Sequence, residues 1–542
     1  MEVSLKTAFN YRHFIVAIAA GIFILTGLLV GCSDDDVNDL PGTGPGSATI
    51  TVDDVIFNPK SPAPGDTLQA TAIVSVDMIN PGEFATYKWT SDDGTFLEDN
   101  KASVRWVAPI TSSIYNLSVT ASISSSSSKL DANVFVGELT DFIDDRAGEL
   151  HPSTSGDDMY YLSGPAQADS GLIVRFKDAA SDAEVFPGMK AGIQFSLDRN
   201  LTQAAHTHLT PFPWRITVMH DELLTGNQTI IAHDERSLVV RPSEYSSPFV
   251  SPDGQMIVYQ GALLDVVPPS AGGADTFSVF LHEIAAGVAQ RATFETRSFY
   301  PTVSSDNRHL VFVSDKDGAL LWELYALPIS GTTVTPDTVQ NALIKLSDTG
   351  GLLGGESIPP SDIPKEWNPN PAFPLLALIG TDEKLRIAST DGTPAILVNM
   401  PGKVIDMKWA SDGQTLAVSV FDAGINSIYL VTTGGEPSRI LDALEGDKYT
   451  NLSWSPDGGL LVYQVARSTN VWYELFDPTG ATGQTVPVRV TPAAAQGAAV
   501  DFGPPLQSFR PAWALGTKTV YLFMLDGDTP SVKTVDLSGV GQ

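Results

Sequence analysis

The sequence predicts an all-β protein in which a β-sandwich precedes a β-propeller. Short segments that alternate apolar and polar residues run through residues 48–542, and turns rich in glycine and proline separate them. The chain of 542 residues contains 46 glycines and 37 prolines, which suits a fold with many tight turns. A strand–turn–strand pattern with SPDG or ASDG at its turn also recurs in the C-terminal part, and internal repeats of this kind indicate an array of similar sheets.

Residues 1–31 have the layout of a signal peptide. Lys6 and Arg12 precede an uncharged apolar run over residues 14–31. The run ends in Leu-Val-Gly-Cys at Cys32, the only cysteine of the chain. This ending resembles the lipobox of bacterial lipoproteins, which implies cleavage before Cys32 and lipidation of its thiol. The alternative is an uncleaved membrane-spanning helix, because a run of this length nearly suffices to cross a bilayer.

Residues 32–47 are predicted to form a flexible tether. Ser33 and three aspartates follow the cysteine, and PGTGPG occupies residues 41–46. A serine at this place resembles lipoproteins of the outer membrane, and the acidic cluster resembles an export signal of surface lipoproteins. We therefore expect a cell-envelope protein, held by its N-terminal lipid at the outer membrane and facing either the periplasm or the outside.

Residues 48–137 are predicted to form the sandwich. Alternation places Tyr115, Leu117 and Val119 on one face of a half-buried strand. The segment resembles the PKD and bacterial Ig-like families, which implies that Trp89 and Tyr115 fill core positions. Modules of this kind usually act as spacers or adhesion units.

Residues 138–542 are predicted to form the propeller. A Ser-Pro-Asp-Gly sequence suits a type I turn between two strands. A four-stranded sheet of this kind buries its faces only against neighbouring sheets, which favours a ring. The array resembles the TolB-like (WD-type) propeller repeats, and its spacing predicts seven or eight blades, or six if the weak N-terminal copies are not repeats. Clear copies occupy 248–259, 407–418 and 452–463, and weaker copies lie near residues 160, 195, 303, 372 and 513.

The charge balance limits the choice of partner. The chain has 63 acidic and 32 basic residues, a formal net charge of −31. Such a surface repels phosphate backbones, which argues against nucleic-acid binding. Partners are expected to be neutral, cationic or bridged by a metal.

Four histidines form the one candidate metal site. His206, His208, His220 and His233 lie within 28 residues of one another, and on a strand His206 and His208 share a face. Nearby carboxylates make a divalent metal a possible cofactor, and no other cofactor is indicated. The alternative is that these are ordinary loop histidines. No G-x-S-x-G elbow or phosphate-binding loop occurs, so no catalytic residue is assigned.

These observations favour a non-catalytic binding or scaffold module whose propeller recognises a protein, a peptide or a glycan. The alternative is a metal-dependent propeller enzyme, a lyase or hydrolase acting on polysaccharide. Four tryptophans are candidates either for a binding surface or for the sheet cores: Trp214, Trp322, Trp367 and Trp472.

Overall fold

The computed structural model describes strands and turns from residue 48 to residue 540. No helix in the part described is long and apolar enough to cross a membrane. The described ranges are 48–77, 83–143, 147–152, 159–163, 172–177, 184–191, 195–211, 214–233, 248–262, 277–293, 297–318, 321–329, 342–347, 365–380, 382–467, 470–480, 486–491, 494–495, 510–515, 517–526 and 529–540.

The first part is a sandwich of two antiparallel sheets that share one core. Apolar and polar residues alternate along these strands, so that each sheet turns one face inward. One sheet has the order β1 (Thr49–Asn58), β2 (Thr67–Asp77), β5 (Ser103–Val107) and β4 (Thr95–Phe96), and the other has the order β3 (Thr86–Ser91), β6 (Ser113–Ile123) and β7 (Ser126–Val136).

The predicted core residues of the sandwich are buried. Trp89 is 1% exposed, and its Nε1 donates to the carbonyl of Lys101 at 2.9 Å. Tyr115 is 8% exposed, and its hydroxyl donates to the carbonyl of Thr111 at 3.0 Å. Each aromatic ring therefore lies in the apolar interior while its polar atom has a partner. The prediction that Trp89 and Tyr115 are core residues is confirmed.

The second part begins with four antiparallel sheets in chain order. We number them sheets 1 to 4. Sheet 1 is β9 (Ala147–Pro152), β10 (Met159–Ser163), β11 (Leu172–Lys177) and β12 (Glu184–Ala191); sheet 2 is β13 (Phe195–Leu197), β14 (Gln203–Pro211), β15 (Trp214–Glu222) and β16 (Asn227–His233); sheet 3 is β17 (Phe249–Val250), β18 (Met256–Ala262), β19 (Phe277–Glu283) and β20 (Val288–Arg291); sheet 4 is β21 (Ser298–Val303), β22 (His309–Ser314), β23 (Glu323–Pro328) and β24 (Ile344–Lys345).

Four more sheets follow, which makes eight sheets within the described part of residues 139–540. Sheet 5 is β25 (Lys365–Trp367), β26 (Leu375–Ile379), β27 (Leu385–Ser389) and β28 (Ile396–Leu397); sheet 6 is β29 (Lys403–Trp409), β30 (Thr415–Asp422), β31 (Ile425–Thr432) and β32 (Pro437–Asp442); sheet 7 is β33 (Asp447–Trp454), β34 (Leu461–Arg467), β35 (Asn470–Phe476) and β36 (Val488–Arg489), with β37 (Ala494–Ala495) beside β35; sheet 8 is β38 (Ala512–Trp513), β39 (Thr519–Asp526), β40 (Thr529–Asp536) and β8 (Leu139–Ile143).

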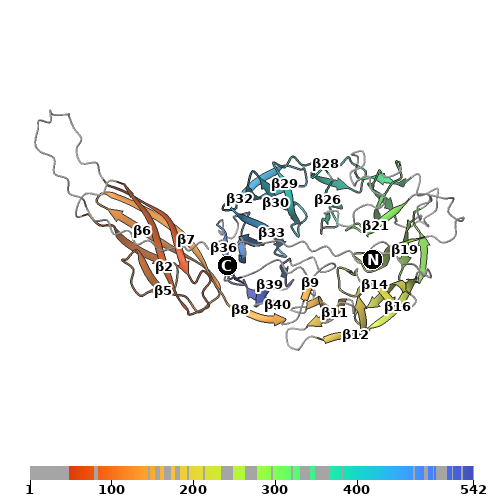
Figure 1. The fold of residues 1–542 in the computed structure, drawn as a ribbon, viewed down its shortest axis with the longest axis horizontal. Coiled ribbons are helices and arrows are strands. Elements are labelled where there is room, and N and C mark those ends of the chain that lie inside the picture. The colour runs from red at the N-terminus through yellow and green to blue at the C-terminus, as the bar shows by residue number, and fades with distance from the viewer. Residues whose placement is uncertain are drawn as a thin grey trace, which may run out of the picture. The chain divides into compact units, whose positions relative to one another are not determined.

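The eight sheets follow one another round a ring (Figure 1). The first strands of adjacent sheets contact each other, as β25 contacts β29 and β29 contacts β33, so these strands form the inner wall of the ring. Apolar clusters fill the space between sheets. One of them joins sheet 4 to sheet 5 through Trp322, Leu324 and Leu376. This radial stacking of four-stranded sheets is the architecture of a β-propeller.

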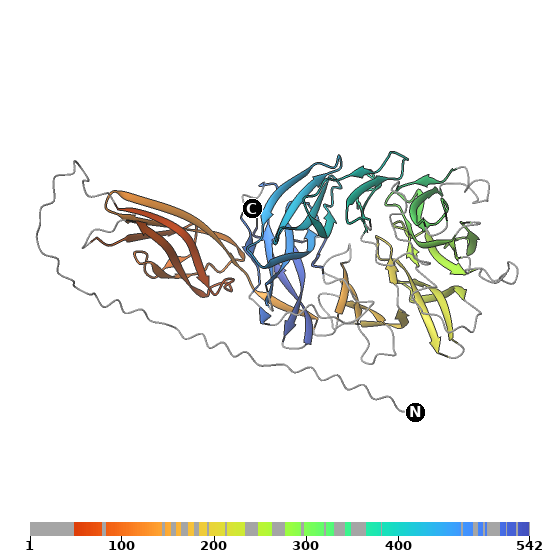
Figure 2. The ribbon, with the colours of Figure 1, turned by 45° about the horizontal axis from the view of Figure 1, so that its top comes forward.

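An N-terminal strand completes the last sheet. Leu139 of β8 pairs with Val535 of β40, and the carboxylate of Asp141 lies 2.7 Å from the ammonium of Lys533. Figure 2 shows β8, in orange, at the end of the blue strands of sheet 8. Sheet 8 also contacts sheet 1 through β38 and β9. The beginning and the end of the propeller are therefore held in one sheet, so β40 of sheet 8 is paired on its outer side.

The repeated turns form as predicted. Gly254 N donates to the carbonyl of Ser251 at 2.9 Å, the bond that closes a four-residue turn. Ser251 Oγ donates to Asp253 Oδ1 at 2.6 Å, and the same oxygen accepts from Gln255 N at 3.1 Å. Gly254 has a φ of 70°, which favours glycine. Asp253 thus acts as a turn former, as the sequence predicted.

Two of the weaker predicted repeats are displaced. The copy near residue 160 is β10, the second strand of sheet 1, whereas β9 is the strand on the inner wall. The copy near residue 372 falls in the turn after β25, where Phe373 N donates to the carbonyl of Asn370 at 3.0 Å. Both sheets lack the Ser-Pro-Asp-Gly signal at this place, so the sequence offers no marker of the exact strand.

Candidate functional site

Tryptophans on the inner wall connect sheets 5, 6 and 7 each to the sheet before it. Trp454 Nε1 donates to the carbonyl of Lys408 at 3.0 Å, and Trp409 Nε1 donates to the carbonyl of Glu366 at 3.2 Å. Trp367 Nε1 donates to Thr302 Oγ1 at 3.2 Å in the same direction. The indoles therefore form a ladder from sheet 4 to sheet 7 and set the spacing of the inner strands.

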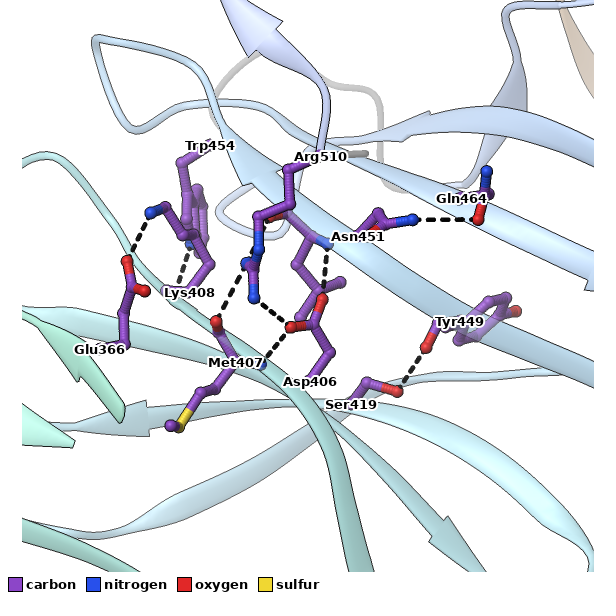
Figure 3. Close-up of polar contacts among 11 residues, drawn as sticks. Glu366, Asp406, Met407, Lys408, Ser419, Tyr449, Asn451, Trp454, Gln464 and Arg510 are labelled. Carbon is purple, nitrogen blue, oxygen red and sulfur yellow. Dashed lines mark hydrogen bonds and ion pairs between the residues drawn. The ribbon is translucent and has the colours of Figure 1, made fainter. Parts of the chain in front are cut away.

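Asp406 and Arg510 join three sheets at the inner wall (Figure 3). Asp406 Oδ2 accepts from Leu452 N of sheet 7 at 2.9 Å, and its Oδ1 accepts from Met407 N at 2.9 Å. Arg510, which leads into β38, donates through Nη2 to Asp406 Oδ1. Its Nη1 donates to the carbonyls of Met407 and Leu452, each at 3.1 Å. One guanidinium and one carboxylate thus connect sheets 6, 7 and 8.

A bulge brings Asp406 into this position. The register of β29 against β30 shifts between Val404 and Asp406, and the register of β33 shifts in the same region, where Asn451 has a φ of 55°. A bulge re-aims side chains at a strand edge. Asp406, Asn451 and Arg510 each stand three residues before the inner-wall tryptophan of their sheet, so the ion pair uses equivalent positions of different repeats.

Charged neighbours and burial shape the electrostatics of the inner wall. Burial raises the pKa of Asp406, while the positive charge of Arg510 acts in the opposite direction. Lys408 Nζ forms an ion pair with Glu366 Oε1. Burial, and after it the charge of Lys408, lowers the pKa of His151 on β9 to about 4. His151 is therefore neutral near pH 7, and its Nε2 has no hydrogen-bond partner in the described part of the chain.

Two carboxylates of the inner wall, drawn in Figure 3, are held by structural contacts. The Asp406 carboxylate accepts from two backbone amides and a guanidinium, and the Glu366 carboxylate is paired with an ammonium. A general acid or base needs a proton position open to a substrate. These carboxylates are committed to structural contacts instead.

A second candidate surface is the turn rim, which we define as the turns between the first and second strands of the sheets. The turns of adjacent sheets are hydrogen-bonded to each other, and Asp253, Asp412 and Asp457 are exposed there. The turn-to-turn bonds run from Arg199 N to Pro252 O (3.1 Å), from Asp253 N to Asn307 Oδ1 (3.2 Å), from Asn370 Nδ2 to Asp412 O (2.7 Å) and from Ser411 Oγ to Pro456 O (2.6 Å).

The predicted metal-binding histidines all lie in sheet 2, but not on one face. His206 of β14 is opposite Met219, whereas His220 of β15 is opposite Ala205. Successive residues of a strand point to opposite faces, so His206 and His220 lie on opposite faces. His208 and His233 are both opposite Thr217, one from each side. The strand register therefore places His220 on one face of the sheet and the positions of the other three predicted histidines on the opposite face.

The two histidines with described side chains have different partners. His206 Nδ1 lies 2.6 Å from Asp221 Oδ2, and both side chains are buried. His220 Nε2 is 2.6 Å from Gln203 Oε1, and burial lowers its pKa. Where side chains are described, no three His, Cys, Asp or Glu residues are grouped so that they could hold one metal ion.

The other residues that the sequence suggested for a functional site are the four tryptophans and Cys32. Three of the tryptophans have structural positions. Trp322 is 0% exposed and Trp472 is 7% exposed, so both belong to the sheet cores, while Trp367 is part of the indole ladder. Nothing is described for the side chain of Trp214. Cys32 lies outside the described residues.

The Asp406–Arg510 pair was missed by the sequence analysis. The sequence feature that could have revealed the pair is an acidic residue in one repeat and a basic residue in another, each three residues before the tryptophan of its repeat. Neither residue type is unusual there, and the partner is not in the adjacent repeat. Only the ring brings the two repeats together.

Comparisons with known proteins found structural neighbours but no matching family. No protein-family model matches the chain, and no curated protein sequence matches it. Solved structures with a similar fold include an oligogalacturonate lyase in complex with manganese (13% identity, TM-score 0.41, 72% of this chain and 98% of that chain) and TolB from Acinetobacter baumannii (11% identity, TM-score 0.31, 76% and 80%). A third is Porphyromonas gingivalis dipeptidyl peptidase 4 (11% identity, TM-score 0.46), of which the match spans 58%.

The chain is a β-propeller protein. This class follows from its own strand order, in which eight successive sheets pack side by side and β8 joins the last of them.

Proposed function

We propose that this chain is a lipid-anchored protein of the cell envelope whose propeller is a non-catalytic binding module for a protein, a peptide or a glycan. The observation that carries this proposal is that two carboxylates of the inner wall are already engaged in ion pairs and hydrogen bonds. Asp406 and Glu366 are held by cations, and Asp406 also by backbone amides. A rigid wall of this kind supports recognition by shape and charge, and it leaves these groups without a proton-transfer role.

The turn rim is the surface through which the propeller recognises its partner. Its turns are cross-linked by hydrogen bonds between sheets, so the exposed side chains on it are held in fixed positions. Pre-ordered surfaces lose less entropy when a partner binds. Exposed carboxylates at Asp253, Asp412 and Asp457, together with the net charge of −31, favour a neutral or cationic partner.

Photo-crosslinking in intact cells tests the recognition surface. Gln255 and Gln414 are exposed on the turn rim, and each would be replaced by a photoreactive residue. Ser438 is exposed on β32, the outermost strand of sheet 6, and serves as the matched control. We expect the same adduct from both rim positions and none from Ser438. Equal labelling at all three positions, or no adduct from the rim, would contradict the assignment of this surface.

The anchor is tested separately. The basic residues and the apolar run before Cys32 support lipidation of its thiol. The Cys32→Ser variant is expected to lose labelling by a radioactive fatty acid and to move from the membrane fraction to the soluble fraction. Labelling that persists in this variant would refute the anchor.

The enzyme alternative remains second because of where the described histidines lie. A polysaccharide lyase or hydrolase with a metal needs an open coordination position that faces its substrate. His206 is 2% exposed and His220 is 5% exposed, and both lie between sheets rather than on the inner wall. Release of sugar fragments from neutral or acidic polysaccharides by the purified chain with added manganese or zinc would replace the binding proposal.

A further inference from the structure

The turn between β3 and β4 contains an Asp-Gly pair whose reactive groups lie next to each other. Asp93 is exposed, and its Oδ1 accepts a hydrogen bond of 2.7 Å from the backbone amide of Gly94. The carboxyl carbon of Asp93 therefore stands beside the amide nitrogen of the next residue. A bond between these two atoms would close a five-membered ring, and such reactions are fast when the reacting atoms are held about 3–3.5 Å apart.

Two donors hold the carbonyl oxygen of the same peptide group. Ser91 Oγ donates to the Asp93 carbonyl at 2.7 Å, and Trp106 Nε1 donates to it at 3.2 Å. When Gly94 N loses its proton, the negative charge is shared with this carbonyl oxygen. Fixed donors aimed at developing charge stabilise it. Trp106 is 0% exposed, so its indole is held in place by the sandwich core.

The Asp-Gly pairs of the repeated propeller turns are held differently. Each glycine amide donates to the carbonyl three residues earlier: Gly254 N to Ser251 O (2.9 Å), Gly413 N to Ala410 O (3.0 Å) and Gly458 N to Ser455 O (2.9 Å). Each carboxylate accepts from the amide two residues later: Asp253 from Gln255 N (3.1 Å), Asp412 from Gln414 N (2.9 Å) and Asp457 from Gly459 N (3.0 Å). In these turns the glycine amide is directed away from the carboxyl group.

We propose that Asp93 is a site of spontaneous modification, at which the folded chain converts aspartate to isoaspartate. Gly94 N gives its proton to water and attacks the carboxyl carbon of Asp93 in its protonated form. The new C–N bond forms, the C–OH bond breaks, and the hydroxyl group leaves as water, which gives a cyclic imide. Water then adds to either carbonyl of the ring and breaks its bond to nitrogen, so the product is aspartate or isoaspartate with no net change in composition.

The modification would disturb the core of the sandwich. Isoaspartate routes the backbone through the side-chain carbon, which adds one carbon atom to the turn. The turn packs closely on Trp106, since a Cβ at Gly94 would lie 2.6 Å from the indole ring. A displaced turn also takes the Asp93 carbonyl away from the buried Nε1 of Trp106. We therefore expect aged chains to unfold at a lower temperature than fresh chains.

Ageing of the purified full-length chain at neutral pH tests this proposal. Isoaspartate is located by peptide mapping with a protease that cuts before aspartate but not before isoaspartate. We expect it to form at position 93 at least about tenfold faster than at Asp253, Asp412 and Asp457, because orientation of the reacting groups changes rates by such factors. In urea, where the turns are unfolded, the four positions should react at similar rates.

Two variants separate the reaction from its setting. Asp93→Glu keeps the charge but would have to close a larger ring, so it should form no isomer at position 93. Ser91→Ala removes one donor to the Asp93 carbonyl and should slow the reaction about fivefold in the folded chain, the factor that corresponds to one hydrogen bond of about 1 kcal/mol. In urea Ser91→Ala should react as the wild type does.

Two results would overturn the proposal. One is isoaspartate at position 93 of the folded chain that forms no faster than at the three propeller turns. The other is a folded Ser91→Ala variant that reacts as fast as the wild type, because the carbonyl donors would then have no effect. The proposal does not depend on the proposed binding function: the crosslinking experiment reports the turn rim, whereas this reaction takes place in the sandwich.

Discussion

Arg510 and Asp406 are 104 residues apart in the chain and form an ion pair on the inner wall of the propeller. Between them stands the first strand of sheet 7, whose Leu452 donates its amide to Asp406 and receives a hydrogen bond from Arg510 at its carbonyl. The pair thus holds sheets 6, 7 and 8 together where their first strands meet. Its position makes it a determinant of ring stability.

Asp406→Asn is expected to lower the free energy of unfolding by about 2–4 kcal/mol, because it leaves a partly buried guanidinium without its counter-charge. Urea unfolding of the full chain measures this loss. The control is Asp99→Asn, since Asp99 pairs with Lys88 while both side chains are largely exposed. Such a surface pair contributes about 0–1 kcal/mol. Similar losses in the two variants would show that Asp406 has no special role.

Trp409→Phe is expected to destabilise the chain more than Trp513→Phe does. Both indoles are buried on the inner wall, and both substitutions remove the same volume. Trp409 Nε1 donates to the carbonyl of Glu366, whereas Trp513 Nε1 has no hydrogen-bond partner in the part described. The difference between the two unfolding free energies should be about 1 kcal/mol, the usual net contribution of one hydrogen bond. Equal losses would mean that the ladder contributes only through packing.

Gly413→Ala should be more damaging than Gly424→Ala. Both glycines have positive φ angles, of 75° and 90°, so alanine strains the backbone at either place. A Cβ at Gly413 would also lie 2.3 Å from Asn368 Oδ1 in the neighbouring turn, whereas a Cβ at Gly424 would meet nothing within 4 Å. We expect a lower thermal unfolding temperature for the first variant than for the second. The opposite order would contradict the close packing of the turn rim.

His151 is expected to make stability sensitive to mild acid. Its pKa is lowered from 6.5 to about 4 in the folded chain, so the unfolded chain binds more protons between these values. Stability should therefore fall as the pH decreases from 6.5 to 4, by at most about 3 kcal/mol from this residue. The His151→Gln variant should lose this part of the dependence when urea unfolding is followed across that range.

Some acid sensitivity is expected to remain in His151→Gln. Burial lowers the pKa values of His220, His282 and His309 in the same direction. The informative quantity is thus the difference between wild type and variant, which should grow below pH 6.5 and be small at pH 7.5. A constant difference across the range would show that His151 titrates at its ordinary value in the folded chain.

The clear repeats were predictable because their signals are local. The copies at 248–259, 407–418 and 452–463 correspond to β17–β18, β29–β30 and β33–β34. A serine, an aspartate and a glycine in four residues suffice to form such a turn, and the bonds around Asp253 show how. Where this chemistry is absent, as before β10 and after β25, the predicted position was displaced.

The candidate sites were less predictable because they depend on register and on distant neighbours. Spacing alone grouped His220 with His206, but the pairing of β14 with β15 places them on opposite faces. A shift of one residue in that register would exchange the faces, and nothing in the local sequence reveals it.

The sequence by itself determined the all-β character of this protein, the turns at its repeats and the buried aromatic residues of its sandwich, because alternation and turn chemistry act over a few neighbouring residues. Only the tertiary structure decided that β8 completes sheet 8, that Arg510 meets Asp406, and that Asp221 stands behind His206. These contacts join residues up to several hundred positions apart. The first two contacts arise when the ring closes, which supplies the partner strands and the low-dielectric environment that strengthens them. The contact of Asp221 with His206 depends on the pairing of β14 with β15 within sheet 2.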